Sequence, residues 1–217
     1  MAIKLAVFDC DGTLVDGQAG ICEAMEAAFD AAGLPRPDRH DIRRIVGLSL
    51  PQAVGLLAPD VGKRERTIAV EAYKENFRQS RMQGRLQEPL FNGIPALLDR
   101  LRVDGWSLAV ATGKSDRGLF SCLSIHGLKD HFVSLQTADR HPSKPDPAML
   151  EAAMVDAAAT ADDTVMIGDT TFDIAMANAA GVRAVGVAWG YHTAEELLAE
   201  GADGVAQDMQ QLAGMLQ

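Results

Sequence analysis

Apolar residues along the chain fall into two alternating patterns. Short, mostly apolar runs, typical of strands buried on both faces of a sheet, occur at residues 5–8, 106–111, 132–136, 164–167 and 183–187. The other segments carry apolar residues at helical spacing and predict helices at 92–104, 116–125, 148–159, 174–180, 195–199 and 207–216. Asn92 and Ser115 are expected to cap two of these helices. Because strands alternate with helices, we predict an α/β fold with a Rossmann-like parallel sheet.

Residues 17–88 differ from the rest because they contain no convincing strand. Helical spacing predicts helices at 18–32 and 61–82, and two shorter helices between them that start at Asp38 and near Ser49. A helical block between two strand-bearing segments is typical of an inserted lid. We therefore predict a core made of residues 1–16 and 89–217 and a helical cap made of residues 17–88.

Carboxylates follow two of the predicted strands at the point where each strand ends. Asp9 and Asp11 come directly after the first strand, and Asp169 and Asp173 follow the run at 164–167. Ligands of an open α/β sheet collect beyond the carboxyl ends of its strands, so we expect one site here. Alternation places Asp9 and Asp11 on the same side if the strand conformation persists, where like charges repel unless a cation relieves them. Mg²⁺ prefers such oxygen ligands, and an Asp can also act as a nucleophile.

Thr112, Gly113 and Lys144 add groups that could bind an anion. Thr112 follows the run at 106–111, and its hydroxyl and the Gly113 N–H can hydrogen-bond phosphate oxygens; a hydroxyl that satisfies local backbone is the alternative. Lys144 lies among three prolines that restrict its turn, whereas a typical surface lysine is flexible and solvated. We interpret Lys144 as a fixed cation that offsets the Asp cluster. Gly12 permits a close backbone approach to a ligand.

The segment Asp-Cys-Asp-Gly-Thr-Leu-Val-Asp at residues 9–16 resembles the opening motif of the haloacid dehalogenase superfamily of phosphatases. Thr112, Lys144 and Asp169 resemble the later motifs of this family and occur in the same order, so that the resemblance extends over residues 3–187. It implies an α/β core with a helical cap after the first motif, a Mg²⁺ cofactor and a small phosphorylated metabolite as substrate. The branch that it resembles is that of phosphoglycolate phosphatase.

The resemblance also implies a role for each motif residue. Asp9 attacks phosphorus to give an aspartyl-phosphate, and Asp11 protonates the leaving alkoxide and then activates water. Asp173 supports the site, and the Cys10 thiol is expected to pack rather than to react. The implied phosphate-binding residues are Asp9, Cys10, Asp11, Gly12, Thr112, Gly113 and Lys144, and the implied Mg²⁺ ligands are Asp9, Asp11 and Asp169.

Two sibling activities and one non-catalytic function are the alternatives. In β-phosphoglucomutase a histidine occupies the position five past the final Asp of the opening motif, and Ile21 stands there in this chain, which disfavours phosphomutase chemistry. Haloacid dehalogenases lack the second aspartate that Asp11 supplies. The third alternative is a phosphate-binding protein with this fold and no turnover, which the complete motif set disfavours.

The charge and the cysteines limit the environment and the partners. The chain has 30 Asp and Glu against 20 Lys and Arg, a net charge of −10, which argues against nucleic acid or an anionic membrane as partner because both require clustered cations. Its three cysteines have no metal-type spacing and are expected to be reduced. The five histidines are interpreted as surface or structural residues. With no signal peptide or bilayer-length apolar run, we expect a cytoplasmic protein.

Substrate specificity is expected to come from the cap, because the core motifs contact only the phosphoryl group and the metal. Arg43 and Arg44 are candidates, since a guanidinium can bind a carboxylate through two hydrogen bonds. The alternative is that both arginines lie on a solvated helix face. A lid that closes over the site leaves little room for a macromolecule, so small soluble substrates are predicted, with phosphoglycolate as the leading candidate.

Overall fold

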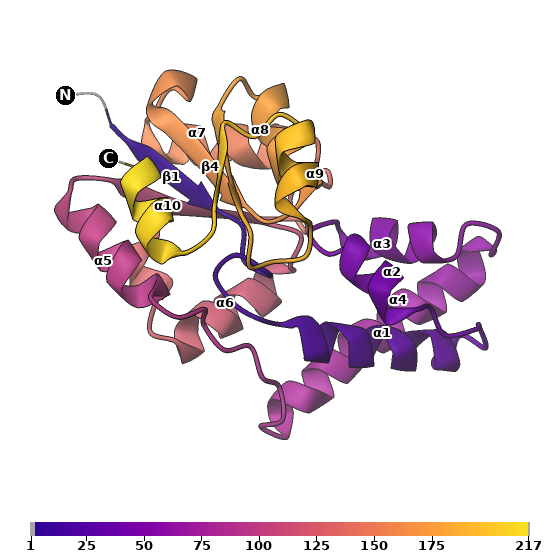
Figure 1. The fold of residues 1–217 in the computed structure, drawn as a ribbon. Helices are drawn as coiled ribbons and strands as arrows, with labels where there is room; N and C mark the ends of the chain where they lie inside the picture. Colours follow the sequence, from indigo (N-terminus) through magenta and orange to yellow (C-terminus); the bar gives the residue numbers. More distant parts are fainter. Residues whose placement is uncertain (1–2, 217) are drawn as a thin grey trace.

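A computed structural model describes residues 3–216 and confirms the α/β fold with a parallel sheet and a helical cap (Figure 1). The sheet has six strands in the order β3-β2-β1-β4-β5-β6. They are β1 (Leu5–Phe8), β2 (Ser107–Thr112), β3 (Ser134–Thr137), β4 (Thr164–Gly168), β5 (Arg183–Val187) and β6 (Gly204–Ala206). All neighbouring strands pair in parallel, and β1 lies between β2 and β4. The carboxyl ends of these three strands therefore meet at one edge of the sheet.

Helices cover both faces of the sheet. One apolar cluster joins α5 (Ile94–Val103), α6 (Asp116–Ile125) and α10 (Met209–Met215) to the strands, and a second one joins α7 (Ala148–Ala157), α8 (Thr171–Ala179) and α9 (Ala194–Ala199) to them. Strand β1 contributes to both, because its residues point alternately to opposite faces. Ala6 and Phe8 belong to the first cluster, and Leu5 and Val7 to the second. Burial on both faces explains why β1 is a continuous apolar run.

Four helices between β1 and α5 form the cap. They are α1 (Gln18–Ala31), α2 (Arg39–Arg44), α3 (Leu50–Leu57) and α4 (Lys63–Met82), and they share an apolar cluster of their own. Figure 1 shows them as a block beside the sheet, with α1 and α4 packed along each other. No helix in the described residues 3–216 is long and apolar enough to cross a membrane. The separate cluster supports the domain boundaries that we propose, with the cap at residues 17–88.

The two segments that connect the cap to the core run side by side. The Asp16 N–H donates to the Pro89 carbonyl over 2.8 Å, and the Phe91 N–H donates to the Leu14 carbonyl over 3.0 Å. Val15 and Leu90 form an isolated antiparallel bridge between the same segments. The chain therefore leaves the core and returns to it at one place, next to the end of β1.

Helix starts and the last strand differ in part from the sequence prediction. Asp38 and Ser115 cap α2 and α6 as predicted, accepting hydrogen bonds from the backbone N–H groups two and three residues on. The predicted Asn92 cap is wrong: α5 begins at Ile94, with Gly93 at the N-cap in a left-handed conformation (φ 89°) that favours glycine. Strand β6 was not predicted, because three residues containing a glycine are too short to show a strand pattern.

The buried strand β1 is expected to carry much of the stability of the core. Phe8 is fully buried, so Phe8→Ala should lower the free energy of unfolding by about 3–5 kcal/mol through lost apolar contact and a residual cavity. Denaturant unfolding followed by circular dichroism measures this loss. The control is Val155→Ala on the exposed side of α7, which should change stability by less than about 0.5 kcal/mol. Equal losses in the two variants would contradict the assignment of β1 to the core.

Candidate active site

The predicted site residues from β1 and β4 meet at the edge of the sheet. Asp9 follows β1, and its N–H donates to the Ile167 carbonyl of β4 over 2.9 Å, which continues the strand pairing by one residue. Asp169 follows β4, and Asp173 lies in the first turn of α8. All three side chains are buried, and carboxylate oxygens of Asp9, Asp169 and Asp173 lie within 4.8 Å of one another. The fold thus concentrates three potential negative charges out of water.

Lys144 supplies a buried cation to this cluster. Its Nζ lies 2.8 Å from Asp9 Oδ1 and 2.6 Å from Asp173 Oδ1, and all three side chains are fully buried. Burial lowers the pKa of Lys144, but the attraction of Asp173 and Asp9 outweighs it and raises the pKa above its usual value. Lys144 therefore stays charged although its side chain is fully buried between Asp9 and Asp173.

Asp173 has both oxygens engaged. Oδ1 pairs with Lys144, and Oδ2 accepts hydrogen bonds from the Thr170 N–H over 3.1 Å and from the Thr170 hydroxyl over 2.7 Å. These contacts with Thr170 form the capping box that starts α8. Asp173 therefore orients Lys144 and begins the helix at the same time.

Asp169 is held from two sides. Its Oδ1 accepts from the Thr13 hydroxyl over 2.8 Å, and its Oδ2 accepts from the Tyr191 N–H over 3.0 Å. Burial, and then the charges of Asp173 and Asp9, raise its pKa well above the usual range. A Cβ added at Gly12 or Gly190 would lie 2.2 Å from Asp169 side-chain atoms, so these glycines leave the space that the carboxylate occupies.

Asp9 is the member of the cluster with an unsatisfied oxygen. Its Oδ2 is buried and has no hydrogen-bond partner among residues 3–216. Burial raises the pKa of Asp9 to about 6, against the opposing attraction of Lys144. Native proteins rarely leave such an atom unpaired, and each case calls for a ligand, an ion or a reaction that uses it. Asp9 Oδ2 is therefore the atom of the cluster that is free to bind a cation or to attack an electrophile.

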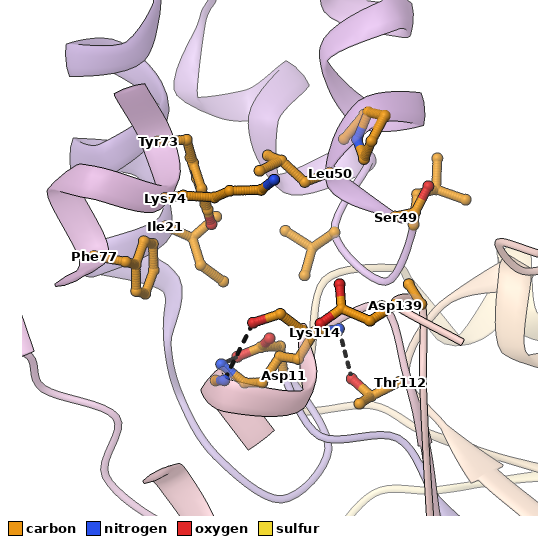
Figure 2. Close-up of a pocket in the computed structure, with 18 of the residues that line it drawn as sticks. Asp11, Ile21, Ser49, Leu50, Tyr73, Lys74, Phe77, Thr112, Lys114 and Asp139 are labelled. Carbon is orange, nitrogen blue, oxygen red and sulfur yellow. Dashed lines mark hydrogen bonds and ion pairs between the residues drawn. The ribbon is translucent and has the colours of Figure 1, made fainter. Parts of the chain in front are cut away.

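Asp11 lies outside this cluster, although it is two residues from Asp9. Its Oδ1 is 3.0 Å from the Nζ of Lys114, which is also 2.5 Å from Glu88 Oε1. Burial raises the pKa of Asp11, and Lys114 opposes that shift. The Asp11 side chain faces the space between the core and the cap (Figure 2). Its place among the predicted metal ligands stays a prediction.

Thr112 and Gly113 lie directly beneath the cap. The Thr112 hydroxyl accepts a hydrogen bond from the Lys114 N–H over 3.3 Å. A Cβ at Gly113 would lie 2.5 Å from the carbonyl oxygens of Gly47 and Leu48, so the cap loop approaches this backbone more closely than any other residue would permit. The end of β2 and the cap loop therefore form one wall of the site.

A cavity of about 730 Å³ lies between the cap and the core. Figure 2 shows Tyr73, Phe77 and Ile21 reaching into it from the cap, opposite Asp11 and Thr112 from the core. The cationic residues in its lining are Lys74, Arg78, Arg81, Lys114 and Arg117. The sequence prediction gave none of these cations a role, because local patterns do not indicate which charged residues of α4, of the loop after β2 and of α6 meet in one cavity.

Arg43 and Arg44 do not line this cavity. Arg44 instead forms an ion pair with Glu196 of α9, with an Nη2–Oε1 distance of 2.7 Å. The Arg44 carbonyl accepts from His192 Nε2 over 3.2 Å, and His192 Nδ1 accepts from the Thr171 N–H over 3.1 Å. In this arrangement Arg44 and the buried His192 join the cap to the core, and the Arg44 guanidinium is engaged by Glu196.

Comparison with known proteins agrees with this geometry. The family model for haloacid dehalogenase-like hydrolases matches residues 6–187, which include Asp9, Thr112, Lys144 and Asp169. The chain belongs to this hydrolase family. It is 40% identical over 200 residues to a protein named "probable phosphatase IndB" from Dickeya dadantii, covering 90% of this chain and 85% of that protein.

Other relatives extend the similarity over nearly the whole chain. A phosphoglycolate phosphatase of Vibrio parahaemolyticus is 28% identical over 218 residues, covering 97% of this chain and 94% of its own. A crystal structure of a predicted phosphatase from Clostridium acetobutylicum superposes with a TM-score of 0.88 at 25% identity, covering 100% of this chain and 99% of the other. The protein is therefore a phosphatase of the haloacid dehalogenase-like hydrolases.

The close fit around Asp169 predicts that Gly190 has no substitute in this phosphatase. The Cβ of Gly190→Ala would meet the Asp169 side chain at 2.2–2.4 Å and force the carboxylate or its loop to move. Since a displacement of about 1 Å can cost a hundredfold in rate, we expect a loss of that order in phosphate release. In the control Gly214→Ala, the new Cβ meets no atom within 4 Å, and activity should be unchanged. Full activity of Gly190→Ala would contradict the need for this placement of Asp169.

Proposed function

We propose that the protein is a Mg²⁺-dependent phosphomonoesterase that works through an aspartyl-phosphate. The observation that carries this proposal is the unpartnered, buried Oδ2 of Asp9 beside Lys144 and Asp169, at the strand edge that adjoins the cavity. A carboxylate in this position is a suitable nucleophile toward phosphorus, and the neighbouring cation offsets charge on the transferring group.

The acidic cluster fits a hard divalent cation. Lys144 pairs with Asp9 and Asp173 of the three clustered carboxylates, which leaves Asp169 without a cationic partner among the described residues. Mg²⁺ in proteins is bound by one or two carboxylates together with water and substrate phosphate. Asp9 and Asp169 are the proposed side-chain ligands, because Asp173 is neutralised by the Lys144 ammonium, whereas Asp169 accepts only from neutral donors and Asp9 Oδ2 has no partner within residues 3–216. When bound, Mg²⁺ would neutralise charge on the phosphoryl oxygens and hold them in place.

The residues of this chain account for both halves of the reaction. In the first half, Asp9 Oδ2 forms a bond to phosphorus while the bond from phosphorus to the ester oxygen breaks, and Asp11 gives its proton to that oxygen. In the second half, the Asp11 carboxylate takes a proton from water as the water oxygen attacks phosphorus, which releases phosphate and regenerates Asp9. Thr112, the Gly113 N–H and Lys144 would hold the phosphoryl group in both halves.

A small phosphorylated metabolite is the proposed substrate, with phosphoglycolate as the leading candidate. Relatives that match almost the whole chain carry that name, and a cavity enclosed by the cap suits a small molecule better than a macromolecule. The cationic lining from α4, including Lys74 and Arg78, is better placed to meet a substrate carboxylate than Arg43 or Arg44. The role of Arg43 and Arg44 in specificity stays a prediction.

Phosphomutase activity is the less favoured candidate. Ile21 lines the cavity at the position where the resemblance to β-phosphoglucomutase requires a histidine, and an isoleucine cannot transfer a proton. A non-catalytic phosphate-binding function would leave the unpartnered Asp9 oxygen without a use. Release of inorganic phosphate in the presence of Mg²⁺ separates this alternative from the proposed function.

The proposed nucleophile is tested by Asp9→Asn. The amide has almost the same shape but is a poor nucleophile, so phosphate release should become undetectable while circular dichroism and the thermal midpoint show a folded protein. Asp162→Asn, in a turn distant from the site, is the control and should retain wild-type turnover. A well-folded Asp9→Asn variant with near wild-type phosphate release would rule out the aspartyl-phosphate.

The proposed metal site is tested by chelation and by a binding measurement that does not depend on turnover. EDTA should abolish phosphate release and added Mg²⁺ should restore it. Mg²⁺ at a hundred times its Kd should stabilise the wild type by about 2.7 kcal/mol, seen as a rise in the thermal midpoint. Asp169→Ala should lose that rise and Asp162→Ala should keep it. Equal responses of the two variants, or full activity in EDTA, would reject Asp169 as a ligand.

A further inference from the structure

A second buried charge cluster lies beside the first and is not explained by the binding of metal or phosphate. Lys114 Nζ is 3.0 Å from Asp11 Oδ1 and 2.5 Å from Glu88 Oε1. The three side chains are 8–12% exposed. The Lys114 ammonium is therefore shared between two carboxylates.

The three residues come from three separate segments. Asp11 lies in the loop after β1, Lys114 in the loop after β2, and Glu88 in the segment that leads from α4 back to the core. The Glu88 carbonyl is bound to His126 Nε2 over 2.7 Å, at the end of α6, so this segment is itself fixed to the core. Glu88 thus holds the far side of the Lys114 ammonium in a defined place.

Lys114 contacts Asp11 but not the acidic cluster around Asp9. Its ion-pair partners within residues 3–216 are Asp11 and Glu88, whereas Lys144 serves Asp9 and Asp173. Without Lys114, the buried Asp11 carboxylate would have no counter-charge in its present position. Rotation about its two side-chain torsions would then turn it away from that position. The ion pair is the interaction that orients Asp11 on the cavity side.

We propose that Lys114, held by Glu88, is a positioning residue that fixes the Asp11 carboxyl group at the leaving-group side of the cavity. This inference rests on the proposed role of Asp11 as the group that protonates the leaving oxygen. Lys114 then influences the reaction through Asp11 and does not contact the phosphoryl group. Glu88, the last residue of the cap, acts one step further away by keeping Lys114 in place.

The leaving group provides a test of this role. An alkyl phosphate such as phosphoglycolate needs a proton on its departing oxygen, whereas p-nitrophenyl phosphate releases a stabilised anion that needs little protonation. Asp11 also acts in the second half of the reaction, which is the same for both esters, so the comparison uses kcat/KM, which covers the steps up to departure of the leaving group. In kcat/KM, a residue that positions the acid should matter for the alkyl ester and much less for the aryl ester. A residue that binds the phosphoryl group should matter equally for both, because both esters carry the same group.

The experiment compares kcat/KM of Lys114→Met, Lys114→Arg and Glu88→Gln on these two esters. We expect Lys114→Met to lower kcat/KM for the alkyl ester at least about tenfold more than for the aryl ester, within the hundredfold or larger effect typical of a general acid. Lys114→Arg should recover part of the loss, and Glu88→Gln should show the same preference with a smaller size. Lys63→Met, an exposed lysine at the start of α4, is the control and should match the wild type.

Each outcome decides the inference. Equal losses of kcat/KM on the two esters in Lys114→Met would overturn it in favour of direct phosphate binding or a structural role. If Lys114→Met does not fold by circular dichroism, Glu88→Gln decides in its place, because it keeps the shape of the side chain; equal losses there would overturn the inference too. Asp11→Asn distinguishes the acid role of Asp11 from the positioning role of Lys114. If Asp11→Asn shows no leaving-group preference, the proposed acid role of Asp11 fails. If it shows one while Lys114→Met does not, only the positioning role of Lys114 fails.

Discussion

The arrangement of the core depends on keeping three carboxylates together away from water. Burial of ionised groups is costly unless each is paired and hydrogen-bonded. Lys144 pairs with Asp9 and Asp173, and the Thr170 hydroxyl donates a hydrogen bond to the other oxygen of Asp173. The Thr13 hydroxyl and the Tyr191 N–H donate to the two oxygens of Asp169. These partners come from segments far apart in the chain, so the cluster and the sheet order that brings the segments together depend on each other. Within the described part of the chain, Asp9 Oδ2 is the oxygen of this cluster that has neither a hydrogen-bond donor nor an ion-pair partner, and the proposed chemistry depends on this atom.

The cap meets the core through polar contacts. The Arg44–Glu196 pair is about one third exposed on both sides, and such pairs contribute little to stability. The Ser49 N–H donates to the Ser143 hydroxyl over 2.7 Å, and the Gly47 and Leu48 carbonyls of the cap loop lie close to Gly113. The apolar clusters of cap and core are separate apart from Tyr191, a core residue that packs against the cluster of the cap. Polar interfaces of this kind permit relative motion, which a substrate that enters beneath the cap requires.

The sequence was sufficient to predict most of the sheet and its reactive edge, because both follow from local signals. A strand buried on both faces, such as β1, must be apolar throughout, and carboxylates directly after it must lie at its end. Lys144 could be identified because prolines restrict its turn. The Lys114–Glu88 contact and the Arg44–Glu196 contact could not be predicted, since they join residues 26 and 152 positions apart whose approach depends on how the cap lies against the core.

Asp9 and Asp11 show how one turn of backbone separates two carboxylates chemically. If the strand conformation persisted, both would lie on the same side, but β1 ends at Phe8, and the chain turns from Cys10 onward, where the Cys10 carbonyl accepts from the Leu14 and Val15 N–H groups. Asp9 then faces a fixed lysine and two further carboxylates, while Asp11 faces the cavity and a different lysine. Two identical side chains in unlike surroundings can take unlike roles, as nucleophile and as proton carrier. The proposed division of roles between the two aspartates therefore requires the two lysines as well as the shared motif.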